Sequence, residues 1–172
     1  MTTTEVAVVD YGMGNLDSVR RAFEVCGAAV VVTSDPDALA RVDRIVLPGV
    51  GAFGEAVDRL GRLGLDEAIR AEAAAGAPVL GVCLGMQLLA TEGTEGVAIG
   101  DPPHAGLDLV PGRVERLRPA DGERVPHVGW NEVRPARTGP LFDDCPPSDL
   151  YFVHSFHLRP DDDADIAATT SY

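Results

Sequence analysis

Short apolar segments alternate with segments of helical periodicity over the first half of the chain, and this alternation constrains the fold most strongly. The segment EVAVVDY at residues 5–11 is rich in valine and predicts a strand buried on both faces. Strands that alternate with helices favour a parallel sheet joined by right-handed crossovers. We therefore expect an α/β fold of the flavodoxin-like kind, with helices on both faces of a parallel core.

Helix caps and periodicity place the individual elements of this half. Asn15 can cap a helix whose apolar face carries Leu16, Val19, Phe23 and Cys26, so we expect Cys26 to be a buried core thiol. Asp35 and Pro36 stand in the favoured order for the start of a short helix. We expect strands at residues 5–11, 29–33, 44–48 and 78–82. We expect helices at residues 16–26, 53–75 with a break near Gly64, and 84–92, and a short helix that begins at residue 36.

The pattern changes after about Gly93. The segments VPGRVERLRPA, RVPHVGWNEVRPA and LYFVHSFHLRP read as strands separated by turns that contain proline. We expect them to form a mainly antiparallel extension of the same sheet. No repeat or linker divides the chain, and 172 residues suffice for one domain with a substantial core, so residues 1–172 are interpreted as a single domain.

Charge and composition exclude several classes of function. A net charge of −13 argues against nucleic-acid binding, which needs a basic surface. All 14 basic residues are arginine, so neither a P-loop lysine nor a Schiff-base lysine is possible. No apolar run is long enough to span a bilayer and the start lacks the features of a signal peptide, so we expect a cytoplasmic protein without membrane contact.

The three cysteines are widely separated, and no C-x-x-C pair is present. A disulfide framework or a zinc site is therefore not expected. Cys145, in DDCPPSD, is interpreted as an incidental loop thiol, and the aspartates at 161–163 and 165 as a solvated turn rather than a metal site. We expect neither a metal nor a cofactor.

Cys83 lies where a strand meets a helix, in the sequence Gly81-Val82-Cys83-Leu84-Gly85. This is the layout of a nucleophile elbow with cysteine in place of serine. The turn demands a strained backbone at the nucleophile and small neighbours, because strand and helix crowd together. The start of the helix also favours a thiolate. We predict that Cys83 is a nucleophile.

Two further segments of the sequence are glycine-rich turns. The segment PGVGAFG at residues 48–54 can either aim backbone N–H groups at a developing oxyanion or simply form a tight turn. The segment GMGNLD from Gly12 resembles half of a dinucleotide loop, but Asp17 occupies the place of its third glycine, so nucleotide binding is not expected.

A cysteine nucleophile also needs a histidine base oriented by a third group. His154 and His157 lie three residues apart on one expected strand and should face opposite sides of the sheet. Neither is followed by an acidic partner, so structural or binding roles are favoured for both.

Five segments together resemble the glutamine amidotransferase subunits of imidazole glycerol phosphate synthase. They are VVDYGMGNLDSV, LPGVGAFGEA, GVCLGMQLL, PHVGWNEV and YFVHSF, and the resemblance runs over residues 5–172. GVCLGMQ alone indicates a class I, triad-type glutaminase, and the other segments narrow the resemblance to this subunit. It implies hydrolysis of L-glutamine to glutamate, and passage of ammonia to a (β/α)₈ cyclase partner within a cytoplasmic heterodimer of histidine biosynthesis.

The resemblance also implies roles for single residues. Cys83 would attack the side-chain amide of glutamine, and Leu84 would supply an N–H group at the elbow. The resemblance implies an oxyanion strand, whose switching is tied to the partner, at Gly49, Val50 and Gly51. Substrate contacts are implied at Gln87, Ser155 and Phe156. Interface positions are implied at Asn15 and Trp130.

One departure from the family pattern is the absence of an F-H-P-E motif, which carries the base and its glutamate. The chain ends at ATTSY, Tyr172, so we expect the last strands to be missing and a strand edge to be unpaired. Loss of the base would reduce the rate by orders of magnitude. Two alternatives stay open: an interaction subunit without catalysis, and a different cysteine hydrolase of the same fold.

Overall fold

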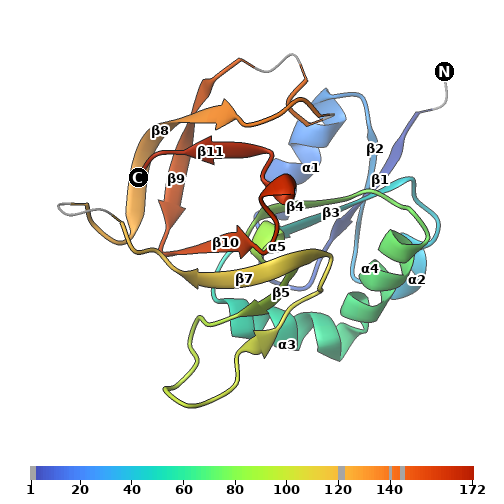
Figure 1. Ribbon diagram of the computed structural model, residues 1–172. Helices are drawn as coiled ribbons and strands as arrows, with labels where there is room; N and C mark the ends of the chain where they lie inside the picture. Colours follow the sequence, from blue (N-terminus) through green and yellow to red (C-terminus); the bar gives the residue numbers. More distant parts are fainter. Residues whose placement is uncertain (1–2, 120–122, 140, 144–145) are drawn as a thin grey trace.

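The computed structural model describes residues 3–119, 123–139, 141–143 and 146–172, so Cys145 lies outside the described residues. Its first half is a four-stranded parallel sheet in the order β2-β1-β3-β4 (Figure 1). The strands are β1 Glu5–Val9, β2 Ala29–Thr33, β3 Arg44–Gly49 and β4 Val79–Cys83. The helices are α1 Leu16–Val25, α2 Pro36–Leu39, α3 Phe53–Leu63, α4 Leu65–Ala74 and α5 Leu84–Gln87.

Helices cover both faces of this sheet, as the sequence predicts. Ala7 and Val9 of β1 point into a core that also contains Leu60 of α3 and Ile69 of α4. Val6 and Val8, which alternate with them, form a second core with Leu16, Val19 and Phe23 of α1 on the other face. The period of two along β1 therefore divides its valines between two layers.

The expected caps are present at α1 and α2. The Asn15 side chain accepts a hydrogen bond from the Ser18 N–H, and the Asp35 side chain accepts one from the Asp37 N–H. Gly64, with φ of 69°, separates α3 from α4. The prediction for Cys26 is wrong: it is the C-terminal cap of α1, one residue beyond the last residue of the helix, and its side chain is exposed.

The helix expected at residues 84–92 is also shorter than predicted. It ends at Gln87, and residues Ala90–Gly93 form β5, which pairs in parallel with β7, Val110–Arg116. An apolar run such as Leu88-Leu89-Ala90 fits a buried helix or a buried strand equally well. Pairing with β7 decides the outcome in favour of the strand.

The second half forms two further sheets instead of continuing the parallel one. One sheet has the order β10-β7-β5-β6 and the other is an antiparallel sheet in the order β11-β8-β9 (Figure 1). The bounds are β6 His104–Ala105, β7 Val110–Arg116, β8 His127–Pro135, β9 Ser148–His154, β10 Phe156–Pro160, a 3-10 helix Asp163–Asp165 and β11 Ala168–Thr170. The mainly antiparallel character is confirmed, whereas membership of a single sheet is not.

The segment LYFVHSFHLRP is two strands rather than the expected one. It breaks at Ser155, where β9 leaves its partner β8 and β10 begins to pair with β7. Consequently His154 and His157 lie in different sheets, and the expectation that they face opposite sides of one sheet is wrong.

β4 forms one edge of the parallel sheet in the described part of the chain, where Leu80 and Val82 are exposed. The unpaired edge expected in the extension stays a prediction. Across the described residues, no helix has the length and apolarity needed to cross a membrane.

Two glycines let α5 cross tightly over β3 and β4. A Cβ atom on Gly85 would lie 1.7 Å from the Leu47 carbonyl oxygen, and one on Gly81 would lie 2.4 Å from the Met86 Cα. Both obstacles are backbone atoms, which cannot rotate away as a side chain can. The crowding that the sequence predicts around Cys83 is therefore present.

Substitution Gly85→Ala tests this packing. The added methyl group must displace β3 or α5, so we expect a loss of about 3 kcal/mol or more in the free energy of unfolding, measured by urea denaturation. Gly61→Ala in α3 is the matched control, because its Cβ would meet nothing within 4 Å. It should stabilise the chain by about 0.5–1 kcal/mol. Equal effects of the two substitutions would contradict the close approach.

Candidate active site

Cys83 is the last residue of β4 and the N-terminal cap of α5. Its φ of 56° and ψ of −117° lie in a region that residues other than glycine rarely adopt. Such strain costs about 1–3 kcal/mol and is concentrated at functional sites. The side chain is exposed, so the corner presents its sulfur to solvent. This is the geometry that the G-x-C-x-G pattern predicts.

The dipole of the one-turn helix α5 stabilises negative charge on Cys83 less than the sequence suggests. It contains only Leu84–Gln87, so the sum of aligned peptide dipoles is smaller than that of the expected longer helix. Its first backbone N–H groups lack partners within the helix and remain able to donate to a ligand. Support for negative charge near Cys83 therefore comes mainly from local N–H groups.

The segment after β3 lies directly beside Cys83. Gly49 is opposite Cys83 in the β3–β4 register, and a Cβ on Gly49 would collide with the Tyr11 hydroxyl and with Leu84. The next N–H group, of Val50, donates to the Met13 carbonyl oxygen at 3.3 Å. In this conformation the Val50 N–H thus stabilises the turn and is not free to bind an oxyanion.

Gly51 gives the segment the freedom to change conformation. Its φ of +112° is one that L side chains rarely adopt. The neighbouring Val50 side chain is exposed, so packing in the core does not hold it in place.

Tyr11 anchors the C-terminal end of β3. Its hydroxyl donates to the Pro48 carbonyl oxygen at 2.9 Å, and the side chain is buried. Burial raises the pKa of Tyr11, negative charge on Cys83 raises it further, and the Arg59 guanidinium lowers it. The phenol is therefore neutral and serves as a hydrogen-bond donor.

Gln87, Ser155 and Phe156 lie at the same end of the molecule. The Gln87 Nε2 group donates to the Phe156 carbonyl oxygen at 2.9 Å, which joins α5 to the start of β10. The Ser155 carbonyl oxygen accepts from the Leu117 N–H, also at 2.9 Å. The structure thus brings together Cys83, Gly49, Leu84, Gln87 and the Ser155–Phe156 segment.

Each of the four histidines is engaged elsewhere. His104 packs against Gly54, and His157 Nε2 lies 3.9 Å from a Glu115 carboxylate oxygen. His127 and His154 contact each other through ring nitrogens 3.1 Å apart. Among the described residues, none of them hydrogen-bonds to Cys83. The chain as described therefore offers the cysteine no histidine base.

Sequence reasoning missed two features close to this site. The Glu95 carboxylate accepts a hydrogen bond from the Phe53 N–H at 2.9 Å and so caps α3, which has no cap from its own N-terminal residue. The paired histidines of β8 and β9 were missed as well. No local pattern reveals either contact, because each joins segments that lie far apart in the sequence.

The outer face of β8 and β9 carries an apolar strip formed by Val128, Trp130, Tyr151 and Val153. The register pairs Val128 with Val153 and Trp130 with Tyr151, and the two aromatic rings meet edge to face with centroids 5.5 Å apart. All four are exposed, Trp130 at 69%. Asn15 lies in a different part of the fold, at the start of α1.

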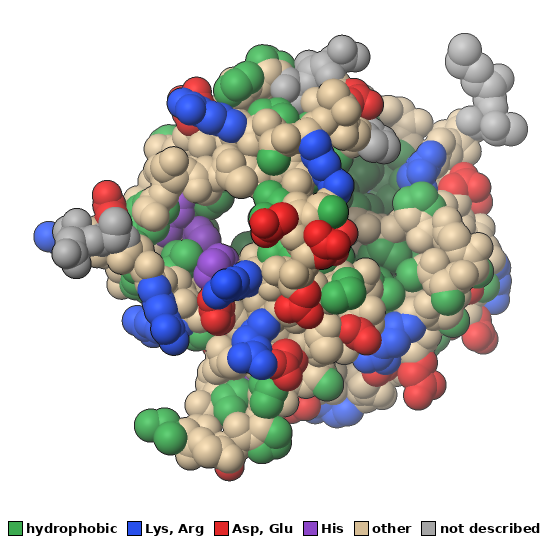
Figure 2. All heavy atoms as spheres, in the orientation of Figure 1, with side chains coloured by type: hydrophobic (Ala, Val, Ile, Leu, Met, Phe, Trp, Pro, Cys, Tyr) green, Lys and Arg blue, Asp and Glu red, His purple; other side chains and the backbone are tan. Residues whose placement is uncertain are grey.

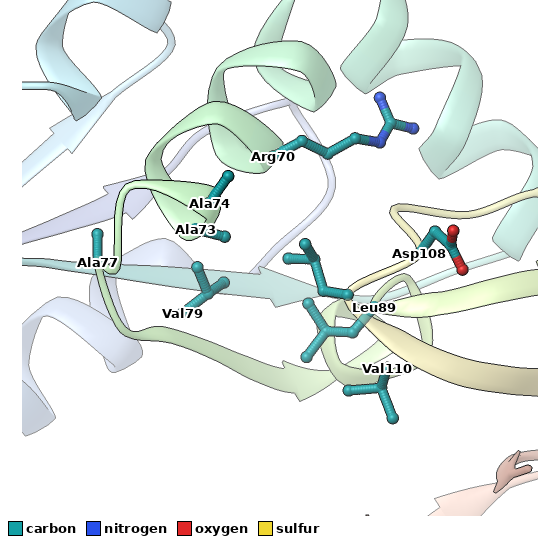
Figure 3. A pocket seen from close by; sticks show the side chains of 9 residues that line it. Arg70, Ala73, Ala74, Ala77, Val79, Leu89, Asp108 and Val110 are labelled. Carbon is teal, nitrogen blue, oxygen red and sulfur yellow. The ribbon is translucent and has the colours of Figure 1, made fainter.

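A cavity of about 400 Å³ lies at the other end of β4, between α4 and the β5–β7 region (Figure 3). Val79, the first residue of β4, lines it, whereas Cys83 is the last residue of that strand. Arg70 at its rim is already bound to the carbonyl oxygens of Gly106 and Leu107 and to Asp66. This cavity is therefore not part of the cysteine site.

Residues 7–172 match the family described as glutamine amidotransferase class-I. The HisH subunit of imidazole glycerol phosphate synthase from Natronomonas pharaonis is 49% identical over 99% of this chain and 77% of its own length. The same subunit from Symbiobacterium thermophilum is 49% identical over 97% of this chain and 76% of its own length.

Among solved structures, a glutamine amidotransferase crystal structure superposes with a TM-score of 0.70 at 18% identity, covering 95% of this chain and 78% of that one. That likeness shows the fold, and the sequence relatives show the family. With a strained cysteine at the strand–helix corner and relatives of this identity over nearly its whole length, the chain belongs to the class I glutamine amidotransferases, among the HisH subunits.

Proposed function

We propose that the chain is the glutaminase subunit of an imidazole glycerol phosphate synthase, in which Cys83 hydrolyses L-glutamine to glutamate and ammonia. The observation that carries this proposal is the left-handed backbone of Cys83, opposite Gly49 in the β3–β4 register. Gln87, in the helix that begins beside Cys83, donates a hydrogen bond to the Phe156 carbonyl oxygen. A cyclase barrel partner receives the ammonia and uses it in histidine biosynthesis.

The reaction proceeds in two steps. The Cys83 thiolate adds to the amide carbon of glutamine, and the resulting oxyanion accepts hydrogen bonds from the Leu84 N–H and from the strand Gly49–Gly51. The C–N bond breaks, ammonia leaves with an added proton, and a thioester remains on Cys83. Water then hydrolyses the thioester and releases glutamate and the free thiol.

Both steps require a proton carrier. The four histidines of the chain are engaged away from Cys83. We infer that the base and its orienting carboxylate are supplied from outside these 172 residues, since the relatives in the comparison are longer than the matched region. The open edge of β4 beside Cys83 offers a strand carrying that base a place to pair.

The bond from the Val50 N–H to the Met13 carbonyl describes a resting state of the oxyanion strand. Rotation of the Gly49–Val50 peptide would break this bond and turn the Val50 N–H group towards Cys83. Contact with the barrel partner would favour the rotated state, which links glutamine hydrolysis to the presence of the ammonia acceptor.

The apolar strip on β8 and β9 is the surface that we assign to the partner. Exposed aromatic and branched residues gathered on one strand pair are typical of an interaction surface. Trp130 is its most exposed aromatic residue. Asn15, the cap of α1, is a second proposed contact.

A second candidate function is an interaction subunit of the same synthase without glutaminase activity. It is favoured by one observation, the absence of a histidine hydrogen-bonded to Cys83 among the described residues. A complex with the barrel that forms without glutamate release would support it.

Glutamate release by the chain together with the segment that supplies the base, in the presence of the barrel partner and its nucleotide acceptor, tests the glutaminase function. We expect Cys83→Ala to abolish release, because no other group can form the thioester. Cys26→Ala is the matched control, since Cys26 is also exposed but lies at the end of α1, and it should leave activity unchanged. Release that persists in Cys83→Ala would contradict the assignment.

Trp130→Ala tests the partner surface. We expect the dissociation constant for the barrel to rise by about 10-fold or more, as for aromatic residues at the centre of an interface, measured by calorimetry. Val25→Ala is the control, because Val25 is 89% exposed at the end of α1 far from the capping residue Asn15. Equal affinities of the two variants for the barrel would show that the strip is not part of the interface.

A further inference from the structure

Two histidines form a continuous hydrogen-bonded chain between β8, β9 and β10. His127 Nε2 lies 3.3 Å from the Asn131 Oδ1 atom, and His127 Nδ1 lies 3.1 Å from His154 Nε2. His154 Nδ1 in turn lies 2.9 Å from the Phe156 carbonyl oxygen. Figure 2 shows histidine side chains gathered at the hollowed part of this face. The catalytic steps described above do not use this chain of contacts.

The partners at both ends of the chain can only accept hydrogen bonds. The Asn131 amide nitrogen donates to the Ser171 carbonyl oxygen at 2.9 Å, so its oxygen must face His127. At the other end the acceptor is the carbonyl oxygen of Phe156. Therefore His127 Nε2 and His154 Nδ1 must both carry a proton.

The contact in the middle requires one more proton. Two ring nitrogens 3.1 Å apart repel each other through their lone pairs unless one of them is protonated. The four nitrogens thus hold three protons when all contacts are made, whereas two neutral rings hold only two. The satisfied pair carries one positive charge.

The surroundings of His127 suit such a charge. Its ring is 1% exposed and lies between the rings of Phe152 and Tyr172, with centroids 4.6 Å and 3.7 Å away and interplanar angles of 15° and 23°. Aromatic faces attract a cation, most strongly where water is excluded. This stacking offsets part of the cost of burying the charge.

Other charged groups lie on the His154 side. His157 of β10 is 3.9 Å from Glu115 of β7, and Arg159 is 3.6 Å from the same carboxylate. Burial lowers the pKa of His157, Glu115 raises it, and positive charge on His154 lowers it. Within the described residues, no carboxylate forms an ion pair with His127 or His154, so the extra proton is held by the contacts of the pair itself.

The chain of contacts ends on the atom that also holds Gln87. The Phe156 carbonyl oxygen accepts from His154 Nδ1 and from Gln87 Nε2, both at 2.9 Å. We propose that His127 and His154 share one positive charge and act together as a positioning pair, fixing the Phe156 carbonyl and through it Gln87 beside Cys83. The consequence for catalysis rests on the proposed glutaminase function, but the shared charge does not.

Removal of the shared proton has a defined effect on the site. One of the three contacts must then fail, because too few protons remain. If the failing contact is the one to Phe156, its carbonyl loses a donor and Gln87 becomes the only side chain that holds it. In that case Gln87 is placed differently by the charged and the neutral pair.

Nitrogen-15 NMR of the 172-residue chain tests the proposal without any enzyme assay. The sequence has four histidines and a single glutamine, so the ring nitrogens are assigned from single substitutions and the Gln87 amide gives one signal. We expect three protonated nitrogens on His127 and His154 while all three contacts of the pair are made. The Gln87 amide shift should change at the pH where the pair loses its proton.

Variants separate positioning from charge. The amide nitrogen of His154→Asn can still donate to Phe156 but cannot carry charge, so the Gln87 shift should be retained and its pH dependence lost. His154→Ala should lose both, and His157→Gln should alter neither. The proposal would be overturned if His127 and His154 carried only two protonated nitrogens at every pH at which the chain is folded. It would also be overturned if the Gln87 signal did not change when the pair loses its proton. Missing glutaminase activity with this NMR signature intact would count against the proposed function alone.

Discussion

The left-handed backbone at Cys83 is the constraint on which the rest of the site depends. A strand and a helix can meet at such an angle only if the residues two positions before and two positions after the cysteine lack Cβ atoms. Gly81 and Gly85 meet this requirement, since a methyl group on either would enter the backbone of its neighbour. The strain at the cysteine is therefore held by packing over a parallel sheet whose central strands are almost fully buried. A flexible loop could not keep the sulfur in this position.

The site itself is assembled from two halves of the fold with different roles. The parallel half supplies the nucleophile and the strand that ends at Gly49, and both are anchored in the core. The strands of the second half supply the carbonyl of Phe156, which reaches Gln87 across the boundary between sheets. The reacting sulfur is thus fixed by backbone packing, whereas the substrate contacts depend on hydrogen bonds. Such contacts are more easily altered by a partner or by protonation than the core is.

The sequence predicts the parallel half well because caps and periodicity are local signals. Asn15, Asp35 and Gly64 mark element ends through their own side chains or backbone, and the structure confirms them. The predictions fail where pairing between distant segments decides the outcome, as in the conversion of Ala90–Gly93 to a strand and the break at Ser155. The contact between His127 and His154 follows from the register of β8 and β9, which no local pattern specifies. The elbow at Cys83 was predictable because its glycines stand next to it in sequence.

The central claim is that the geometry at Cys83, rather than simple exposure, makes it a nucleophile towards glutamine. Mass spectrometry after treatment with an L-glutamine analogue that carries an electrophile in place of its side-chain amide tests this claim most directly. Cys26 is an internal reference, because it is equally a free and exposed thiol but lies at the end of α1. We predict an adduct on Cys83 and none on Cys26, whereas iodoacetamide should modify both. Equal modification of the two thiols by the glutamine analogue, or none at Cys83, would contradict the account.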